Sequence, residues 1–367
     1  MNIENGTCYV LFAYDVALSI DLDEAERRLS NVAQRGSLKS KHPAPAHFEY
    51  QPAPVRVTQT VEVLAIGDYR TAPTVDLIFY NFGAVSAVYN IPLQGTLSEL
   101  RELSETLYDN ELLLADSQQR VEQILSLITP ALSKVELPDV VEDYVIFQIR
   151  EFSSPCSPEE LRTIYPQEIA QILRAEKQLL SSQEIHEALS QRLSFGLADA
   201  VFVDWHAALI FDKEGDDVRS VLEFANVELL EMRYLDHRLD DALDRSYNVL
   251  SRRRTWAPLR VFGSYRADLR QVALLQADSA ILFEGVNNAL KLLGDQYLAR
   301  VYRLASQRFH LSEWDGSILR KLETLESIYQ KMSDDAANQR IEILEWIIII
   351  LIAVEIVLSF FPDLRAH

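Results

Sequence analysis

Few residues of this 367-residue chain have the types and spacing that chemistry requires. The nearest arrangements are His186 beside Glu187, and Asp204 with His206 in the stretch DWH, where a histidine next to a carboxylate could act as a general base. Such pairs arise often by chance. The simpler interpretation is that His206 is a strand residue that faces solvent, or a core residue whose ring nitrogens are hydrogen-bonded. Motifs of phosphate loops, dinucleotide sites, zinc proteases, paired-cysteine metal sites and serine hydrolases do not occur. We therefore predict no catalytic residue, no cofactor and no metal site.

Charged residues form two runs in the second half of the chain. The acidic run comprises Glu223, Glu228, Glu231, Asp236, Asp240, Asp241 and Asp244, and the basic run comprises Arg245, Arg252, Arg253, Arg254, Arg260, Arg266 and Arg270. Helices joined by a short turn would bring the two runs together, which favours mutual neutralisation. Contact of Arg252, Arg253 and Arg254 with RNA or a ribosome is an open alternative, and so is metal binding by the acids. The net charge of −20 repels phosphates, so we expect no direct nucleic-acid binding.

The C-terminal stretch RIEILEWIIIILIAVEIVLSFFPDLRAH is strongly apolar. As a helix, residues 343–361 would rise roughly 28 Å, close to the thickness of a bilayer's hydrocarbon core. Their apolar side chains outweigh the cost of the charged Glu355 on the insertion scale. The sequence thus predicts a membrane anchor that includes Trp346, Ile350, Glu355 and Phe361, with a buried core helix as the alternative. Since the N-terminus lacks a basic signal-peptide region, we expect a single-pass inner-membrane protein with its bulk in the cytoplasm.

The elements that must position these residues change in character along the chain. Apolar, β-branched runs alternate with helical segments at 21–34 and 96–109, for which Asp21 and Thr96 are the expected N-caps. Residues 161–215 have no firm assignment, since the stretch 192–212 fits either a helix followed by a strand or a strand pair. The predicted parts are a mixed α/β domain at 1–215 with an exposed proline-rich loop near 39–55, long antiparallel helical hairpins at 216–342, a transmembrane helix at 343–361 and a short tail at 362–367. The predicted fold class is α+β.

Apolar residues near the C-terminus recur at alternating spacings of four and three, which is the heptad pattern of a coiled coil. This seam comprises Ile318, Leu322, Leu325, Tyr329, Met332, Ala336, Gln339, Ile343, Trp346 and Ile350. It fits a helix packed on another helix of the same chain or an intermolecular coiled coil, and both interpretations stay open.

Several stretches resemble the family named for "required for meiotic nuclear division". RIEILEWIIIILIAVEIV is similar to that family's C-terminal pattern at Arg340, Glu345, Trp346 and Glu355, and IFYNFGAVSAVYN is similar to its strand motif at Phe82, Gly83, Tyr89 and Asn90. The family's usual Trp is replaced by Tyr89 here. The resemblance covers roughly residues 55–360, and it implies a membrane-anchored, non-catalytic, oligomeric protein whose mitochondrial relatives support translation. It also implies that Glu355 meets a polar group on a neighbouring membrane helix, from another copy or a different protein. The alternative is that Glu355 is protonated and tolerated within the apolar span.

Two classes of function follow from these observations. The leading hypothesis is a tail-anchored scaffold that self-associates through its helical arm, presents an α/β domain in the cytoplasm and has a membrane-protein or ribosome-associated partner. The alternative is a membrane-localised enzyme or ligand-binding domain with a pocket within residues 55–215. Polar groups converging around Asp204 and His206 in a deep pocket would favour the alternative.

Overall fold

The computed structural model describes residues 1–33, 38–40, 53–135, 140–252 and 296–360, with seven residues between 270 and 284. The chain divides into two compact units, Met1–Leu235 with Ile281–Gly316, and Asp236–Ala280 with Ser317–His367. The first unit holds the sheet and the helices that cover it. The second holds the C-terminal parts of two long helices. Most of the predicted proline-rich loop lies outside the described residues.

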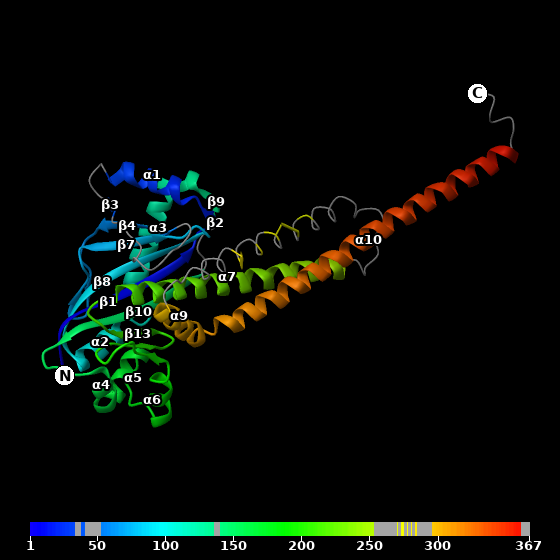
Figure 1. The fold of residues 1–367 in the computed structure, drawn as a ribbon. Coiled ribbons are helices and arrows are strands. Elements are labelled where there is room, and N and C mark those ends of the chain that lie inside the picture. Colours follow the sequence, from blue (N-terminus) through cyan, green and yellow to red (C-terminus); the bar gives the residue numbers. More distant parts are fainter. Residues whose placement is uncertain are drawn as a thin grey trace. The chain divides into compact units, whose positions relative to one another are not determined.

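A large sheet is the centre of the first unit. Its strands are β1 (Asn2–Asp15), β3 (Leu38–Ser40), β4 (Val55–Thr60), β7 (Thr74–Phe79), β8 (Ala84–Thr96), β10 (Val141–Phe152), β11 (Arg192–Leu193), β12 (Ala200–Val203) and β13 (Ala207–Phe211). Within the described part of the chain these nine strands pair in the order β11-β12-β13-β10-β1-β8-β7-β4-β3 (Figure 1). The three long strands β8, β1 and β10 are antiparallel neighbours, whereas β10 and β13 are parallel. The mixed α/β character predicted for residues 1–215 is therefore confirmed.

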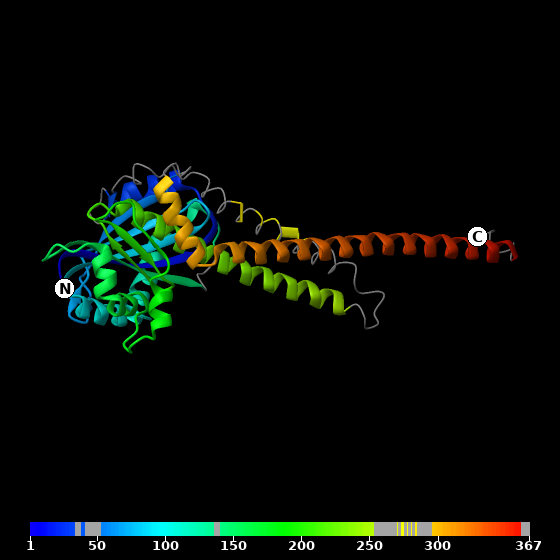
Figure 2. The same cartoon turned by 60° about the horizontal axis from the view of Figure 1, so that its bottom comes forward.

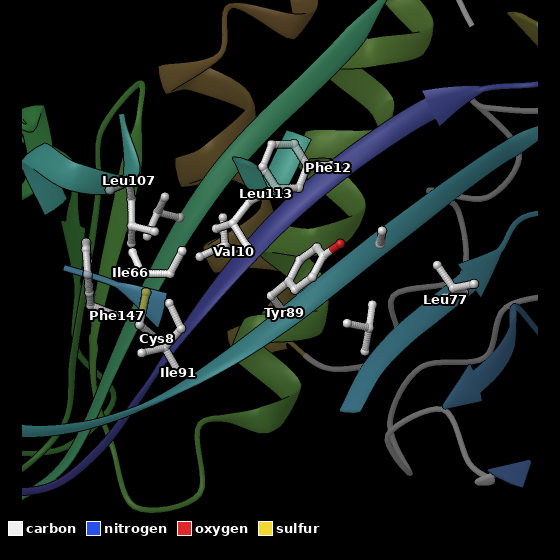
Figure 3. Packing of buried hydrophobic residues seen from close by; sticks show 14 of the residues in the cluster. Cys8, Val10, Phe12, Ile66, Leu77, Tyr89, Ile91, Leu107, Leu113 and Phe147 are labelled. Carbon is white, nitrogen blue, oxygen red and sulfur yellow. The ribbon is translucent and has the colours of Figure 1, made fainter. Parts of the chain in front are cut away.

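One face of this sheet packs on helices to form the main hydrophobic core. The covering elements include α1 (Leu22–Ala33), α2 (Leu97–Leu107), α3 (Glu111–Ile128) and α5 (Pro166–Arg174). Val10 and Phe12 of β1 lie in this core with Tyr89 of β8 and Leu113 of α3 (Figure 3). Because β1 is covered on both faces, its sequence is apolar at consecutive positions instead of alternating.

Both N-caps expected from the sequence are confirmed. The Thr96 side chain accepts the Glu99 backbone N–H while the Glu99 carboxylate accepts the Thr96 N–H, which forms a capping box. Asp21 Oδ1 accepts the Glu24 N–H at 3.0 Å. The sequence did not predict α3 or the short helices α4 (Pro158–Ile164), α5 and α6 (Ser182–Ala188). Of the two open interpretations of residues 192–212, the strand pair is correct, since β12 and β13 form an antiparallel hairpin.

The opposite face of the sheet is covered by the first part of α7 (Asp216–Arg252) and by α9 (Gln296–Arg308). The Arg219 guanidinium of α7 lies 4.5 Å from the centre of the Tyr9 ring in β1. Phe224 of α7 lies against Tyr80, which follows β7, and against Tyr302 of α9. Alternate residues of β1, beginning at Tyr9 and ending at Asp15, therefore point toward α7.

In the second unit, α7 and α10 (Leu311–Phe360) lie side by side (Figures 1 and 2). Ser317 of α10 hydrogen-bonds to Asp236, and Lys321, one turn later, pairs with Asp240 at 2.6 Å. Because the contacts advance in the same direction along both helices, the two helices run parallel here. The predicted antiparallel hairpins are thus not seen between these two helices, and most of the segment that connects α7 to α9 lies outside the described residues.

The prediction of a transmembrane helix, and with it the single-pass inner-membrane location, is wrong. Among the residues that the structure describes, no helix combines the length and apolarity that a membrane span requires. Between Glu345 and Glu355 the uncharged run is nine residues, which rises about 14 Å, less than half of a hydrocarbon core. Phe361 of the predicted anchor lies outside the described residues.

Candidate functional site

The tight turn between β12 and β13 holds Asp204, Trp205 and His206, the polar group that the sequence singled out. The Asp204 N–H donates to the Ala207 carbonyl at 2.9 Å, which closes the hairpin. Asp204 Oδ1 accepts the Trp205 N–H at 2.7 Å. The Tyr144 hydroxyl of β10 donates to the Asp204 carbonyl at 2.9 Å. These hydrogen bonds hold the turn in one conformation against the sheet.

The carboxylate of Asp204 is the centre of a buried ion network. Asp204 is only 1% exposed, and its Oδ1 accepts from Arg308 Nε of α9 at 2.8 Å while Oδ2 accepts from Arg174 Nε of α5 at 3.0 Å. Arg174 also pairs with Glu184, and both arginines lie 3.6 Å from Glu187. Glu187, the acid beside His186, therefore belongs to this network. Because the arginines occupy both Asp204 oxygens, this carboxylate is not available as a base.

Aromatic rings flank the same turn on both sides. Trp205 stacks on His310 with 5.1 Å between ring centres, and the Arg308 guanidinium lies 5.9 Å from the Trp205 ring. On the other side the Tyr108 ring meets His206 edge-on at 4.9 Å. Burial lowers the pKa of His206, although neighbouring carboxylates oppose the effect, and its Nε2 has no hydrogen-bond partner among the described residues. A neutral histidine without an aligned acid does not form a base dyad.

Three glutamates of α7 lie in the interior of the first unit. Glu223 pairs with Arg56 at 3.0 Å and with Arg219 at 2.8 Å. Glu228 accepts the Tyr302 hydroxyl at 2.8 Å, and burial raises the pKa of Glu228 to about 8. Glu231 is fully buried, neither of its oxygens has a hydrogen-bond partner in the described part of the chain, and burial raises its pKa well above the ordinary range.

Among the described residues, the cations that pair with the acidic run lie mainly outside the predicted basic run. Arg56 and Arg219 pair with Glu223, and Lys321 pairs with Asp236 and Asp240. Of the basic run, Arg245 lies 4.0 Å from Asp241. The side chain of Arg252, and all of Arg253 and Arg254, lie outside the described residues, so their predicted roles stay predictions.

The predicted heptad seam divides α10 into two stretches. Ile318, Leu325 and Met332 of the seam are fully buried, so this stretch packs within the chain. From Ile341 to Ile356 every described side chain is exposed, including Trp346 at 64% and Ile350 at 56%. Glu355 is also exposed. This second stretch presents large apolar side chains without a covering element among the described residues.

No sequence motif predicted several of the side chains that pair with Asp204 and with the buried glutamates of α7. Arg174 and Arg308 are 30 and 104 residues from Asp204, and no motif spacing joins them. Tyr302 and Arg56 likewise reach the α7 glutamates only through the fold. No group of three or more His, Cys, Asp or Glu side chains in the described ranges is arranged to hold a metal ion.

Comparison with known proteins identifies related sequences without a described activity. A family model described as "Uncharacterized protein MJ0711, N-terminal domain" matches residues 5–217. The uncharacterized protein MJ0711 of Methanocaldococcus jannaschii is 27% identical over 267 residues, which cover 72% of this chain and 74% of that protein. The similarity therefore extends beyond the matched domain, and neither description states a substrate or a partner.

Proposed function

The chain belongs to the family of the uncharacterized protein MJ0711, and on that premise we propose that it is a non-catalytic scaffold that self-associates through α10 and presents its α/β unit to other proteins. The observation that carries this proposal is the exposed apolar stretch of α10. Its large side chains are 48% to 64% exposed and comprise Ile341, Leu344, Trp346, Ile347, Ile348, Ile349, Ile350, Leu351, Ile352, Val354 and Ile356.

The size of this apolar surface argues for a stable interface. Together the side chains present on the order of 1,000 Å² of apolar surface, above the roughly 300–600 Å² of the largest patch on a typical monomer. This is comparable with the ~800 Å² that each partner buries in a standard protein interface. Leaving such an area in water is costly, so a second molecule should cover a large part of it.

The distribution of charge around α10 indicates which side of the helix is covered. At about 100° per residue, Glu345 and Glu355 lie roughly 80° apart, so both carboxylates occupy one side of the helix. The opposite side presents Trp346, Ile350 and Val354, and it continues the heptad seam. Two copies can bury these sides against each other while both carboxylates stay in water. Homo-oligomers are the commonest assemblies of soluble proteins, so we assign the covering molecule to a second copy of this chain.

The polar network at the β12–β13 turn supports a structural role for this unit. Asp204 engages both arginines, so the turn lacks the free carboxylate and oriented histidine that the alternative, a ligand-binding or catalytic domain, would use. The same residues instead fasten β12 and β13 to α5 and α9. A rigid unit of this kind suits the presentation of a surface to partners.

Matched substitutions on α10 test self-association. Ile350→Lys places a charge in the seam, whereas Ile352→Lys places one beside the carboxylates at a similar exposure, 51% against 56%. By light scattering after size-exclusion chromatography, we expect the unmodified chain and Ile352→Lys to be oligomers of equal mass and Ile350→Lys to be a monomer. An unmodified chain of monomer mass, or equal effects of both substitutions, would contradict the proposal.

We further propose that this family is related to the family "required for meiotic nuclear division" and that the chain supports translation through a ribosome-associated partner. The supporting residues are Arg340, Glu345, Trp346 and Glu355 near the C-terminus and Phe82 with Gly83 in the β7–β8 turn. Crosslinking and capture of the tagged full-length chain from cells should then enrich ribosomal or translation proteins over a tag-only control. Equal recovery in both samples would rule this role out.

A further inference from the structure

Arg150 of β10 differs from the other described arginines of the first unit that are partly or fully buried, because each of those pairs with a carboxylate. The arginines that pair in this way are Arg28, Arg56, Arg101, Arg120, Arg162, Arg174, Arg219 and Arg308. Arg150 is also partly buried, yet its hydrogen bonds within the described ranges are all with uncharged side chains. Burial of a cation without an anion is costly, although the chain has 55 acidic residues from which a partner could come.

Three uncharged side chains hold the Arg150 guanidinium in place. Its Nη1 donates to Thr7 Oγ1 of β1 at 2.8 Å, and its Nη2 donates to the Tyr9 hydroxyl and to Gln148 Oε1, each at 3.1 Å. The Tyr9 hydroxyl donates to Gln148 Oε1 at 3.2 Å, and Gln148 Nε2 donates to the Asp212 carbonyl at 3.3 Å. The contacts therefore fix the direction of the guanidinium and leave its charge without a counter-charge.

Hydrogen-bond donors of Arg150 and Thr7 remain available beside one another. Of the N–H groups of a guanidinium, Nε–H and one N–H of Nη1 donate to no residue that the structure describes. Nε is not among the buried atoms that lack a partner, so water or a ligand can reach it. Thr7 Oγ1 accepts from Arg150, and no side chain or carbonyl of the described residues accepts the Thr7 hydroxyl proton. Because Thr7 Oγ1 and Arg150 Nη1 are 2.8 Å apart, one bound group can accept from both.

The acidic side chains nearest to this place along the chain are directed elsewhere. Glu151 follows Arg150 in β10, so its side chain projects from the other face of the sheet. Asp212 Oδ1 accepts the Glu214 N–H at 2.9 Å, and the Asp216 carboxylate lies 3.8 Å from Arg219. None of these carboxylates comes within 4.0 Å of Arg150, so among the described residues the chain does not provide the missing anion itself.

An oxyanion would supply both the negative charge and the acceptors that this arrangement lacks. The guanidinium group binds phosphate and carboxylate oxygens through charge-assisted hydrogen bonds, and a neighbouring hydroxyl adds a further donor. The net charge of −20 repels anions in general, so an anion can bind here only through a local, correctly placed cation. We propose that Arg150 and Thr7 form a binding site for one oxyanion, the phosphate or carboxylate group of a small ligand, on this face of the sheet.

Direct binding of two anions to the full-length chain tests the proposal. Radiolabelled inorganic phosphate and, separately, radiolabelled acetate are measured by equilibrium dialysis at one pH and at an ionic strength held constant with NaCl. We expect saturable binding of one equivalent per chain, with phosphate indicating a phosphate group and acetate alone a carboxylate. Arg150→Gln should weaken binding about tenfold or more, and Thr7→Val should weaken it severalfold. Arg70→Gln is the matched control, because it removes the same charge from an exposed arginine of β6 (Tyr69–Arg70).

Two results would overturn the site. If the unmodified chain binds neither anion saturably at millimolar concentration, Arg150 serves only to join β10 to β1. Equal loss of binding in Arg70→Gln and Arg150→Gln would show that the anion responds to overall charge and not to this arginine. If Arg150→Gln fails to fold, as judged by circular dichroism, the comparison of Thr7→Val with the unmodified chain decides the question, since that substitution keeps every charge.

Discussion

Asp204 joins a hairpin turn to two helices through its two carboxylate oxygens, so we predict that its charge is needed for stability. In Asp204→Asn the guanidinium groups of Arg174 and Arg308 lose their shared anion, and breaking a buried ion pair costs about 3–5 kcal/mol. Glu187→Gln is the control, because Glu187 is half exposed and lies 3.6 Å from each arginine, and exposed pairs contribute about 1 kcal/mol or less. Urea unfolding of both variants measures the difference. Equal unfolding midpoints would show that Asp204 has no special role.

A second prediction at the scale of single residues is that the chain loses stability at alkaline pH because of Glu228. Burial raises its pKa to about 8, so the folded state binds its proton more tightly than the unfolded state does. The resulting stabilisation is complete below the unfolded pKa of about 4.5 and is lost as the pH rises through about 8. Glu228→Gln can still accept from Tyr302 and has no charge, so it should unfold later than the unmodified chain at pH 9. Melting curves between pH 6 and 9 that decline equally for both proteins would contradict this assignment.

At the scale of elements, the turn between β7 and β8 depends on Gly83. Its φ of 109° is a conformation that side chains disfavour, and an added Cβ would lie 1.7 Å from the Ala17 carbonyl oxygen. The Gly83 carbonyl also accepts the Val16 N–H at 3.1 Å, which links the turn to the end of β1. We therefore expect Gly83→Ala to cost more than about 4 kcal/mol or to prevent folding.

Gly67→Ala is the matched control for this turn. Gly67 also has a positive φ, 56°, but the nearest atom to an added Cβ is Thr106 Oγ1 at 3.9 Å. Its cost should be the conformational term alone, about 1 kcal/mol. Circular dichroism melting of both variants gives the comparison, and similar melting temperatures would show that the contact with Ala17 relaxes at little cost.

At the scale of the whole molecule, self-association through α10 should link stability to protein concentration. A partner that binds only the folded chain stabilises it by mass action. A hundredfold increase in concentration should therefore raise the melting temperature of the unmodified chain and leave that of Ile350→Lys unchanged. A melting temperature that stays constant for both would mean that the exposed stretch of α10 does not drive assembly.

Local patterns were sufficient to predict many elements of this protein. The apolar run of β1, the caps at Asp21 and Thr96, and the apolar spacing that includes Ile318 and Met332 could be predicted because each depends on residues close in sequence. At the C-terminus, hydropathy led to a wrong prediction. The insertion free energy summed over the window was favourable, but a sum does not show that the carboxylates of Glu345 and Glu355 interrupt the apolar run.

Only the tertiary structure decided which polar groups meet. Arg308 reaches Asp204 across 104 residues of sequence. Glu231 of α7 likewise comes within electrostatic reach of Asp15 of β1 only through the fold. Burial is likewise a property of the fold. From sequence alone an acidic residue of a helix is expected to face water, and only the packing of that helix on the sheet shows that the residue is buried. Sequence periodicity assigns a residue to one face of its own element, whereas the order of strands and the packing of helices determine what that face meets.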